Sequence, residues 1–100
     1  MSEAVVVRYV TKAECADENA RLVKAVYEEL ATVDPGGFEY TTFRLDDGVT
    51  FLHVAVLDGD DNPLTRSPAF AEFQSGIAAR CVEGPAVAPA TTVGAYRTAR

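Results

Sequence analysis

Tryptophan is absent from this 100-residue sequence, histidine occurs once and cysteine twice. A disulfide framework needs several cysteines, and a zinc site needs clustered cysteine or histidine ligands. Cys15 and Cys81 are isolated in the sequence, and His53 has no second histidine beside it. We therefore expect reduced cysteines, no metal site and no cofactor.

Positive charge is also scarce, with 9 Lys and Arg residues against 15 Asp and Glu residues and a net charge of −6. A nucleic-acid partner needs a basic stripe, which this sequence lacks. The long apolar window of a membrane-spanning helix and the pattern of a signal peptide are missing as well. We expect a cytoplasmic protein with no nucleic-acid and no membrane partner.

The residues that are present have the composition of a folded protein, with 48% hydrophobic and 24% charged side chains. The length is typical of one domain, so we expect a single domain over residues 1–100. So short a chain buries a modest fraction of its surface, and self-association would add to its stability.

The first half of the chain predicts a strand, a helix and a hairpin. Ala4–Val10 is rich in β-branched residues, and Thr11 with Glu14 has the spacing of a capping box. Apolar residues then recur at helical spacing as far as the segment DPGG, which ends the helix. Two strands joined by the turn signal DDG follow, over residues 38–45 and 49–57.

The second half predicts one helix and one strand. Ser67 is a typical N-cap and Pro68 suits the first helical position, so a helix is expected from there to about Val82. The last strand is expected over Thr91–Arg97. The order β-α-β-β-α-β is that of the ferredoxin-like α+β fold, in which two helices cover one face of a four-stranded antiparallel sheet. We expect the two helices to be parallel, which would separate Cys15 from Cys81 by about 20 Å, the length of a helix.

The apolar strand residues do not alternate with polar ones. The run FLHVAVL presents apolar side chains in both directions, and the first strand is similar except for Arg8. A sheet face that contacts solvent normally carries polar side chains, and a large exposed apolar patch is unusual for a monomer. The pattern therefore predicts a homodimer with the two sheets packed face to face.

These features resemble a known family. The order of elements, the segment DPGGFEY before a short hairpin, the run FLHVAVL and the helix start SPAFAEF are similar to the antibiotic biosynthesis monooxygenase-like proteins over about residues 4–98. The resemblance implies a dimeric α+β barrel made of two ferredoxin-like protomers, in a family with cofactor-independent monooxygenases, haem-degrading enzymes and proteins of no known activity. Fold alone does not transfer an activity. The haem-degrading members use an Asn, a Trp and a His on the second helix. This chain has no Trp and no His on its second helix, and it offers only Asn19, on its first helix.

His53 is the candidate catalytic residue, because an imidazole can act as a base near neutral pH. With a two-residue loop at Asp47-Gly48, Thr42 pairs opposite His53, and Tyr40 and Arg44 share its face. These side chains, with Arg8 and Asn19, are the candidate ligand-binding residues. A three-residue loop shifts the register by one residue and separates the cluster. Both registers remain open, as does the alternative that His53 is a buried, hydrogen-bonded structural residue.

Two other polar features have plainer interpretations. Arg8 must find an anion or reach the rim of its apolar strand, and a structural ion pair is the expected outcome. The segment Asp58–Pro63 begins with the alternating oxygen ligands of a calcium loop but has Pro63 where glycine is needed, so it is interpreted as an acidic surface loop.

Two hypotheses for the function follow. The first is a homodimeric protein of unassigned activity with an apolar small-molecule pocket. The second is a cofactor-independent monooxygenase-like enzyme that acts on a hydrophobic, acidic or phenolic small molecule with His53 as the base.

Overall fold

The computed structural model describes residues 3–57 and 61–96. Four strands form one sheet: β1 (Glu3–Thr11), β2 (Phe38–Arg44), β3 (Thr50–Leu57) and β4 (Cys81–Ala90). The order across the sheet is β2-β3-β1-β4, and every neighbouring pair is antiparallel. This arrangement is the ferredoxin-like α+β fold predicted from the order of elements.

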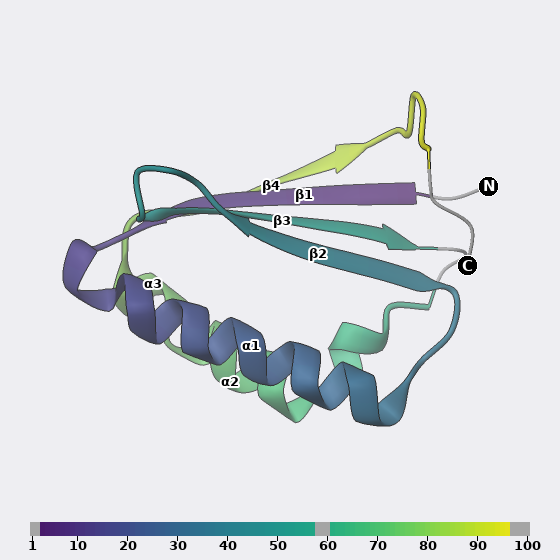
Figure 1. Ribbon diagram of the computed structural model, residues 1–100, viewed down its shortest axis with the longest axis horizontal. Helices are drawn as coiled ribbons and strands as arrows, with labels where there is room; N and C mark the ends of the chain where they lie inside the picture. The colour runs from purple at the N-terminus through teal and green to yellow at the C-terminus, as the bar shows by residue number, and fades with distance from the viewer. Residues whose placement is uncertain (1–2, 58–60, 97–100) are drawn as a thin grey trace.

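The helices form a second layer on one face of the sheet, as Figure 1 shows. The long helix α1 (Ala16–Val33) lies beside α2 (Pro68–Ser75), and the short α3 (Ile77–Arg80) leads into β4. Two short 3-10 turns, Ala13–Cys15 and Pro63–Arg66, precede α1 and α2. The side chains between the layers form the core: Tyr9, Ala16, Leu22, Val23, Val26, Phe51, Leu64 and Phe73.

The start of α1 differs from the prediction. Thr11 is the last residue of β1, and its hydroxyl donates to the carbonyl oxygen of Val49 at 3.1 Å instead of capping a helix. Pairing with the neighbouring strand satisfies the Thr11 side chain, so the capping box with Glu14 does not form. The helix ends as predicted, because Asp34 adopts a left-handed conformation (φ 54°) and donates its N–H to the Leu30 oxygen.

The second helix begins as predicted but ends early. The Ser67 hydroxyl accepts the N–H of Phe70, with Pro68 in the first turn. The helix stops at Ser75, and β4 occupies 81–90, where the sequence suggested the end of the helix and a crossover. Thr91–Tyr96, the described part of the strand predicted at Thr91–Arg97, contains no strand, and Arg97 lies outside the described residues.

The last strand lies earlier in the chain than predicted, and it contains two prolines, which normally argue against a strand. Pro85 and Pro89 lie within β4, which is an edge strand, and an edge strand tolerates residues that cannot donate an N–H to a ladder. The register between β1 and β4 also shifts between Arg8 and Val10, so an extra residue of β4 is accommodated in a bulge near Pro85.

The predicted direction of the helices was wrong as well. Because β1 and β3 are antiparallel, the helices that follow them run in opposite directions, and the start of α1 meets the end of α3. The N–H of Lys12 donates to the Arg80 oxygen at 2.7 Å, and Cys81 pairs with Thr11. Cys15 and Cys81 therefore lie at the same end of the molecule, and both are free thiols. Burial, with a smaller contribution from the nearby Cys15, raises the pKa of the Cys81 thiol, although the Arg80 charge opposes this.

Candidate functional site: a tyrosine–histidine network beside an apolar pocket

His53 lies on the face of β3 that the helices cover, and its side chain is 4% exposed. The register of the hairpin is the one expected for the two-residue loop, with Thr42 opposite His53. Asp47 stabilises the turn, since its carboxylate accepts the N–H groups of Val49 and Thr50 and the Thr50 hydroxyl. These hydrogen bonds, chiefly the one from the Thr50 hydroxyl, lower the pKa of Asp47.

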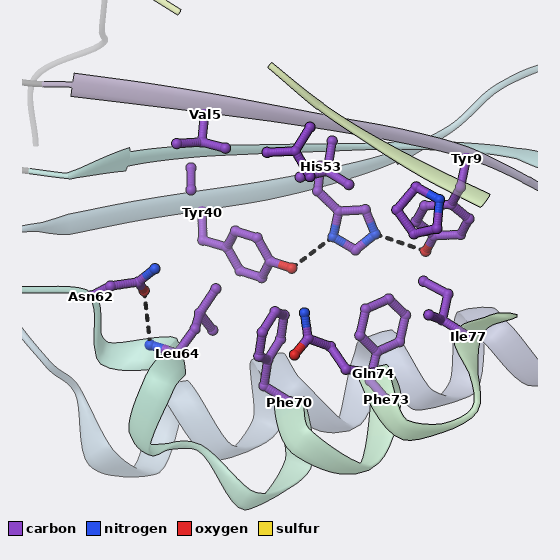
Figure 2. Close-up of a pocket in the computed structure, with 14 residues that line it drawn as sticks. Val5, Tyr9, Tyr40, His53, Asn62, Leu64, Phe70, Phe73, Gln74 and Ile77 are labelled. Carbon is purple, nitrogen blue, oxygen red and sulfur yellow. Dashed lines mark hydrogen bonds between the residues drawn. The ribbon is translucent and has the colours of Figure 1, made fainter. Parts of the chain in front are cut away.

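Both nitrogens of His53 contact a phenol. The Nε2 atom is 2.8 Å from the Tyr9 hydroxyl, and the Nδ1 atom is 2.6 Å from the Tyr40 hydroxyl (Figure 2). The Thr42 hydroxyl lies farther from Nδ1, at 3.2 Å, and is also 2.8 Å from the hydroxyl of Tyr27. The imidazole is thus hydrogen-bonded at both ends between β1 and β2.

The network continues from Tyr9 into the helices. The side-chain amide of Asn19, which is fully buried on α1, donates to the Tyr9 hydroxyl at 2.8 Å. The Arg80 Nε donates to the Asn19 Oδ1 at 3.1 Å, and a second Arg80 nitrogen donates to the Phe73 carbonyl oxygen at 2.7 Å. Arg80 is 7% exposed, and its guanidinium lies over the Phe73 ring.

The structure brings together only part of the predicted cluster. Tyr40 and Thr42 contact His53, and Asn19 reaches it through Tyr9. Arg44 shares their face but pairs with Asp17 of α1 at 3.1 Å, away from the imidazole. Arg8 points to the other face of the sheet and forms the expected ion pair, with Glu83 at 3.6 Å.

Sequence reasoning missed two members of the network, Tyr9 and Arg80. The signal for Tyr9 is its position, because in an antiparallel pair of β1 and β3 it lies on the same face as His53. Arg80 was not singled out. A signal for it existed in the sequence IAAR, where an arginine ends an apolar helix that must pack against the sheet.

A pocket of about 170 Å³ lies between the sheet and α2, beneath His53 (Figure 2). Its polar lining groups come from Tyr9, Tyr40, His53, Asn62 and Gln74. The remaining walls are apolar and belong to Val5, Val7, Ala55, Leu64, Phe70, Phe73, Ile77, Pro85 and Val87. Val87 is 64% exposed, so the pocket extends to the surface beside β4.

Burial keeps the network neutral around the imidazole. Desolvation lowers the pKa of His53 from 6.5 to about 4, so the ring is uncharged at pH 7. Desolvation likewise raises the pKa of Tyr9 to about 12 and raises that of Tyr40 further. At neutral pH the pocket therefore offers two protonated phenols and a neutral imidazole, which can form hydrogen bonds with a ligand oxygen or pass a proton along the network.

The acidic loop predicted at Asp58–Pro63 is described only from Asp61 onward, and its Asn62 lines the pocket. Asp58, Gly59 and Asp60 of the acidic loop are outside the described residues, whereas Asp61 pairs with Arg66 at 2.7 Å and the Asn62 side chain accepts the N–H of Leu64. Within the described ranges, no three His, Cys, Asp or Glu side chains are grouped so that they could hold a metal ion. In the same part of the chain, no helix combines the length and apolar character needed to cross a membrane.

No protein-family model and no curated protein matches this chain. Solved structures do match. SnoaB from Streptomyces nogalater, described as a cofactor-independent oxygenase, superposes with a TM-score of 0.67 at 17% identity, over 94% of this chain and 95% of that chain. A protein described as an antibiotic biosynthesis monooxygenase gives a TM-score of 0.69 at 16% identity, over 92% and 99% of the two chains.

A third match is a dimeric ferredoxin-like protein of unknown function from Jannaschia sp., with a TM-score of 0.69 at 14% identity, over 92% of this chain and 100% of that chain. At identities this low the matches establish a common fold and leave activity open. The expected resemblance is therefore confirmed at the level of the fold: the chain has the ferredoxin-like architecture of the antibiotic biosynthesis monooxygenase-like proteins.

Proposed function

We propose that the protein binds a small, largely apolar molecule with a polar oxygen in the pocket beneath His53. The observation that carries this proposal is the hydrogen-bonded group of Tyr40, His53 and Tyr9 beside largely apolar walls. Ligand sites typically combine an apolar lining with a few polar groups that fix the orientation of the ligand. A cavity of about 150 Å³ accommodates benzene, so the pocket has room for an aromatic ring.

The lining of the pocket supports specific contacts for such a ligand. Phe70 and Phe73, whose ring centroids are 5.8 Å apart, offer aromatic surface on the helix side of the pocket. Tyr40 offers a hydroxyl at the sheet side, where Figure 2 shows it directed toward the imidazole. The exposed side chain of Gln74 adds a polar group to the lining, so the bound molecule can carry a second polar substituent.

Calorimetric titration with a panel of one-ring and two-ring phenols and aromatic ketones tests this proposal. Tyr40→Phe removes one hydroxyl from the pocket and should weaken binding about fivefold, since a hydrogen bond contributes about 1 kcal/mol. Tyr27→Phe is the matched control, because its hydroxyl contacts Thr42 and its side chain does not line this pocket. Equal losses in both variants, or no binding by any compound, would contradict the proposal.

A second candidate function is cofactor-independent oxygenation of an acidic phenolic substrate. The observation that favours it is the continuous path from Tyr40 through both imidazole nitrogens to Tyr9, along which a substrate proton can move. In such a reaction O₂ supplies one oxygen atom to the substrate, and the other leaves as water with two hydrogens from the substrate. The low pKa of His53 makes it a weak base, so only an acidic substrate would react.

Oxygen uptake separates the second candidate from simple binding. The parent protein and His53→Gln are compared on quinol and anthrone-type substrates. A rate that falls at least a hundredfold in His53→Gln, with binding retained, supports catalysis through the imidazole. Equal rates in both proteins would remove His53 as the base, and no uptake by the parent would leave binding as the function.

We also propose that two copies associate through the uncovered face of the sheet. Val6, Leu52 and Val54 are only partly buried on this face, and Phe43 is 49% exposed. The structurally similar Jannaschia protein is described as dimeric. Light scattering should give a mass of two chains at micromolar concentration, and a stable monomer would contradict the proposal.

A further inference from the structure

The orientation of the Asn19 amide is determined by Arg80. A guanidinium can only donate hydrogen bonds, so the atom of Asn19 that faces the Arg80 Nε must be the carbonyl oxygen. The amide nitrogen of Asn19 must then face Tyr9 and donate to its hydroxyl oxygen. The hydrogen-bond direction is thus set at the buried end of the network, with no choice between the two orientations of the amide.

Tyr9 passes this direction on to His53. The Tyr9 side chain is 1% exposed, and its oxygen already accepts the Asn19 amide. Among the described residues the only remaining partner of its own hydrogen is the His53 Nε2 atom. An N–H at Nε2 would leave the Tyr9 hydrogen buried without an acceptor, so Nε2 is unprotonated and the single proton of the neutral ring lies on Nδ1.

The Nδ1 proton in turn determines what Tyr40 can do. With Nδ1 as a donor, the Tyr40 oxygen, 2.6 Å away, must accept from it. The Tyr40 hydrogen is therefore directed away from the imidazole, to the Thr42 hydroxyl or to a ligand in the pocket. We propose that Arg80 and Asn19 act as positioning residues that make Tyr40 a hydrogen-bond donor, so that the pocket selects an aromatic ligand with an acceptor oxygen, such as a conjugated ketone or an enolate.

The charge of Arg80 supports the same selection. Within residues 3–57 and 61–96, no carboxylate lies within ion-pair distance of this buried guanidinium. A buried cation without an anion favours negative charge nearby, and the hydrogen bonds through Asn19 and Tyr9 polarise the imidazole in that direction. The pocket therefore suits a partly or fully anionic oxygen better than a neutral hydroxyl group.

Gly76 is part of this arrangement. A Cβ atom at this position would lie 2.8 Å from the Arg80 Nη1, which is closer than atoms in ordinary contact. The absence of a side chain between α2 and α3 leaves the space that the buried guanidinium occupies.

The inference rests on the proposed ligand site for its choice of ligand, but its first step can be measured without any ligand. Because His53 is the only histidine, long-range ¹H–¹⁵N spectra of the imidazole report its tautomer without ambiguity. The parent protein at pH 7 should show the proton on Nδ1. A proton on Nε2 in the parent would overturn the inference, whatever any variant does.

Asn19→Asp reverses the direction of the network at nearly constant shape. The new carboxylate keeps the contact with Arg80 but accepts from Tyr9, so the Tyr9 oxygen must accept from His53 and the proton should move to Nε2. Tyr27→Phe is the control and should leave the proton on Nδ1. A folded Asn19→Asp protein with its proton still on Nδ1 would contradict the assigned role of Asn19.

Two probes of matched size then test the selection of ligand. 1-Indanone carries an acceptor oxygen and no donor, whereas indole carries an N–H donor and no acceptor. The parent should bind 1-indanone at least tenfold more tightly than indole, and Asn19→Asp should reduce or reverse this ratio at least tenfold. Equal affinities in the parent would overturn the selection. Binding of neither probe, with the Nδ1 tautomer present, would contradict the ligand site and its selection together, while the tautomer assignment would stand.

Discussion

The two faces of the sheet differ far more in structure than in sequence. On β3, Phe51 and His53 are 2% and 4% exposed beneath the helices, whereas the adjacent Leu52 and Val54 on the other face are only partly buried. On β1, Tyr9 is buried and the neighbouring Arg8 is exposed. An apolar residue on either face has the same side-chain chemistry, so the covering layer decides which face becomes a core with a polar network and which remains available for association.

The largest expected effect is a difference in the stability lost when either of two phenylalanines, one on each face of the sheet, is replaced by alanine. Phe51→Ala removes a ring that stacks on Tyr9 at 5.5 Å, and it should lower the free energy of unfolding by about 3–5 kcal/mol. Phe43→Ala, at a side chain that is 49% exposed, should lower it by less than about 1.5 kcal/mol. Urea unfolding of both variants at one protein concentration checks the difference, and similar losses would show that the two faces are equally packed.

The second expected effect is a pH dependence of the free energy of unfolding, and it comes from His53 on the covered face. The pKa of His53 is about 4 in the folded chain and 6.5 as its ordinary value, because burial disfavours the charged ring. The unfolded chain therefore binds more protons between these values, and the stability contributed by neutral His53 is complete above pH 6.5 and is lost as the pH falls toward 4. The loss over this window should be about 3 kcal/mol, since one pKa unit corresponds to about 1.4 kcal/mol.

His53→Gln is the control for this pH dependence, because hydrogen bonds in the folded protein also lower the pKa of carboxylates such as Asp47, and their protonation adds to the loss of stability in acid. The difference between the two unfolding curves isolates the imidazole. Parallel curves from pH 7 to 4 would show that His53 is not desolvated in the folded protein.

The third effect tests the uncovered face. Leu52→Asp places a charge in the proposed dimer interface and should weaken association at least tenfold, which corresponds to about 1.4 kcal/mol. Val33→Asp, at the exposed end of α1, places the same charge in the helix layer and should leave association unchanged. Sedimentation of both variants over a dilution series measures this, and an unchanged dimer in Leu52→Asp would place the interface elsewhere.

The smallest expected effect is that of Arg8→Gln, which is measured against a second arginine, Arg80. Arg8→Gln breaks an exposed ion pair with Glu83 and should change the free energy of unfolding by less than about 0.5 kcal/mol. Arg80→Gln removes a buried charge-assisted hydrogen bond to the Phe73 carbonyl oxygen and should cost about 1.5–3 kcal/mol. The contrast holds if the melting temperature of the Arg80 variant is well below that of the Arg8 variant, and it fails if the two variants are equally stable.

The sequence by itself determined the features that depend on nearby residues. The strand of Ala4–Val10, the stop at DPGG and the cap at Ser67 follow from conformational preferences and hydrogen bonds within a few residues. The order of these elements was enough to predict the ferredoxin-like fold. The hairpin lay at the limit of this reasoning, because DDG permits two registers and only the structure selects the one that places Thr42 beside His53.

Tertiary structure decided the rest, because the decisive contacts join distant residues. Pro85 and Pro89 discouraged a strand locally, but the edge position of β4 removed the need for their missing N–H groups. The opposite directions of the helices brought Arg80 to Asn19, 61 residues away, and antiparallel pairing brought Tyr9 to His53, 44 residues away. Periodicity identifies the face on which each of these residues lies, but only the packed layers show which of them share a hydrogen bond, because that depends on burial and on donor direction at the contact itself.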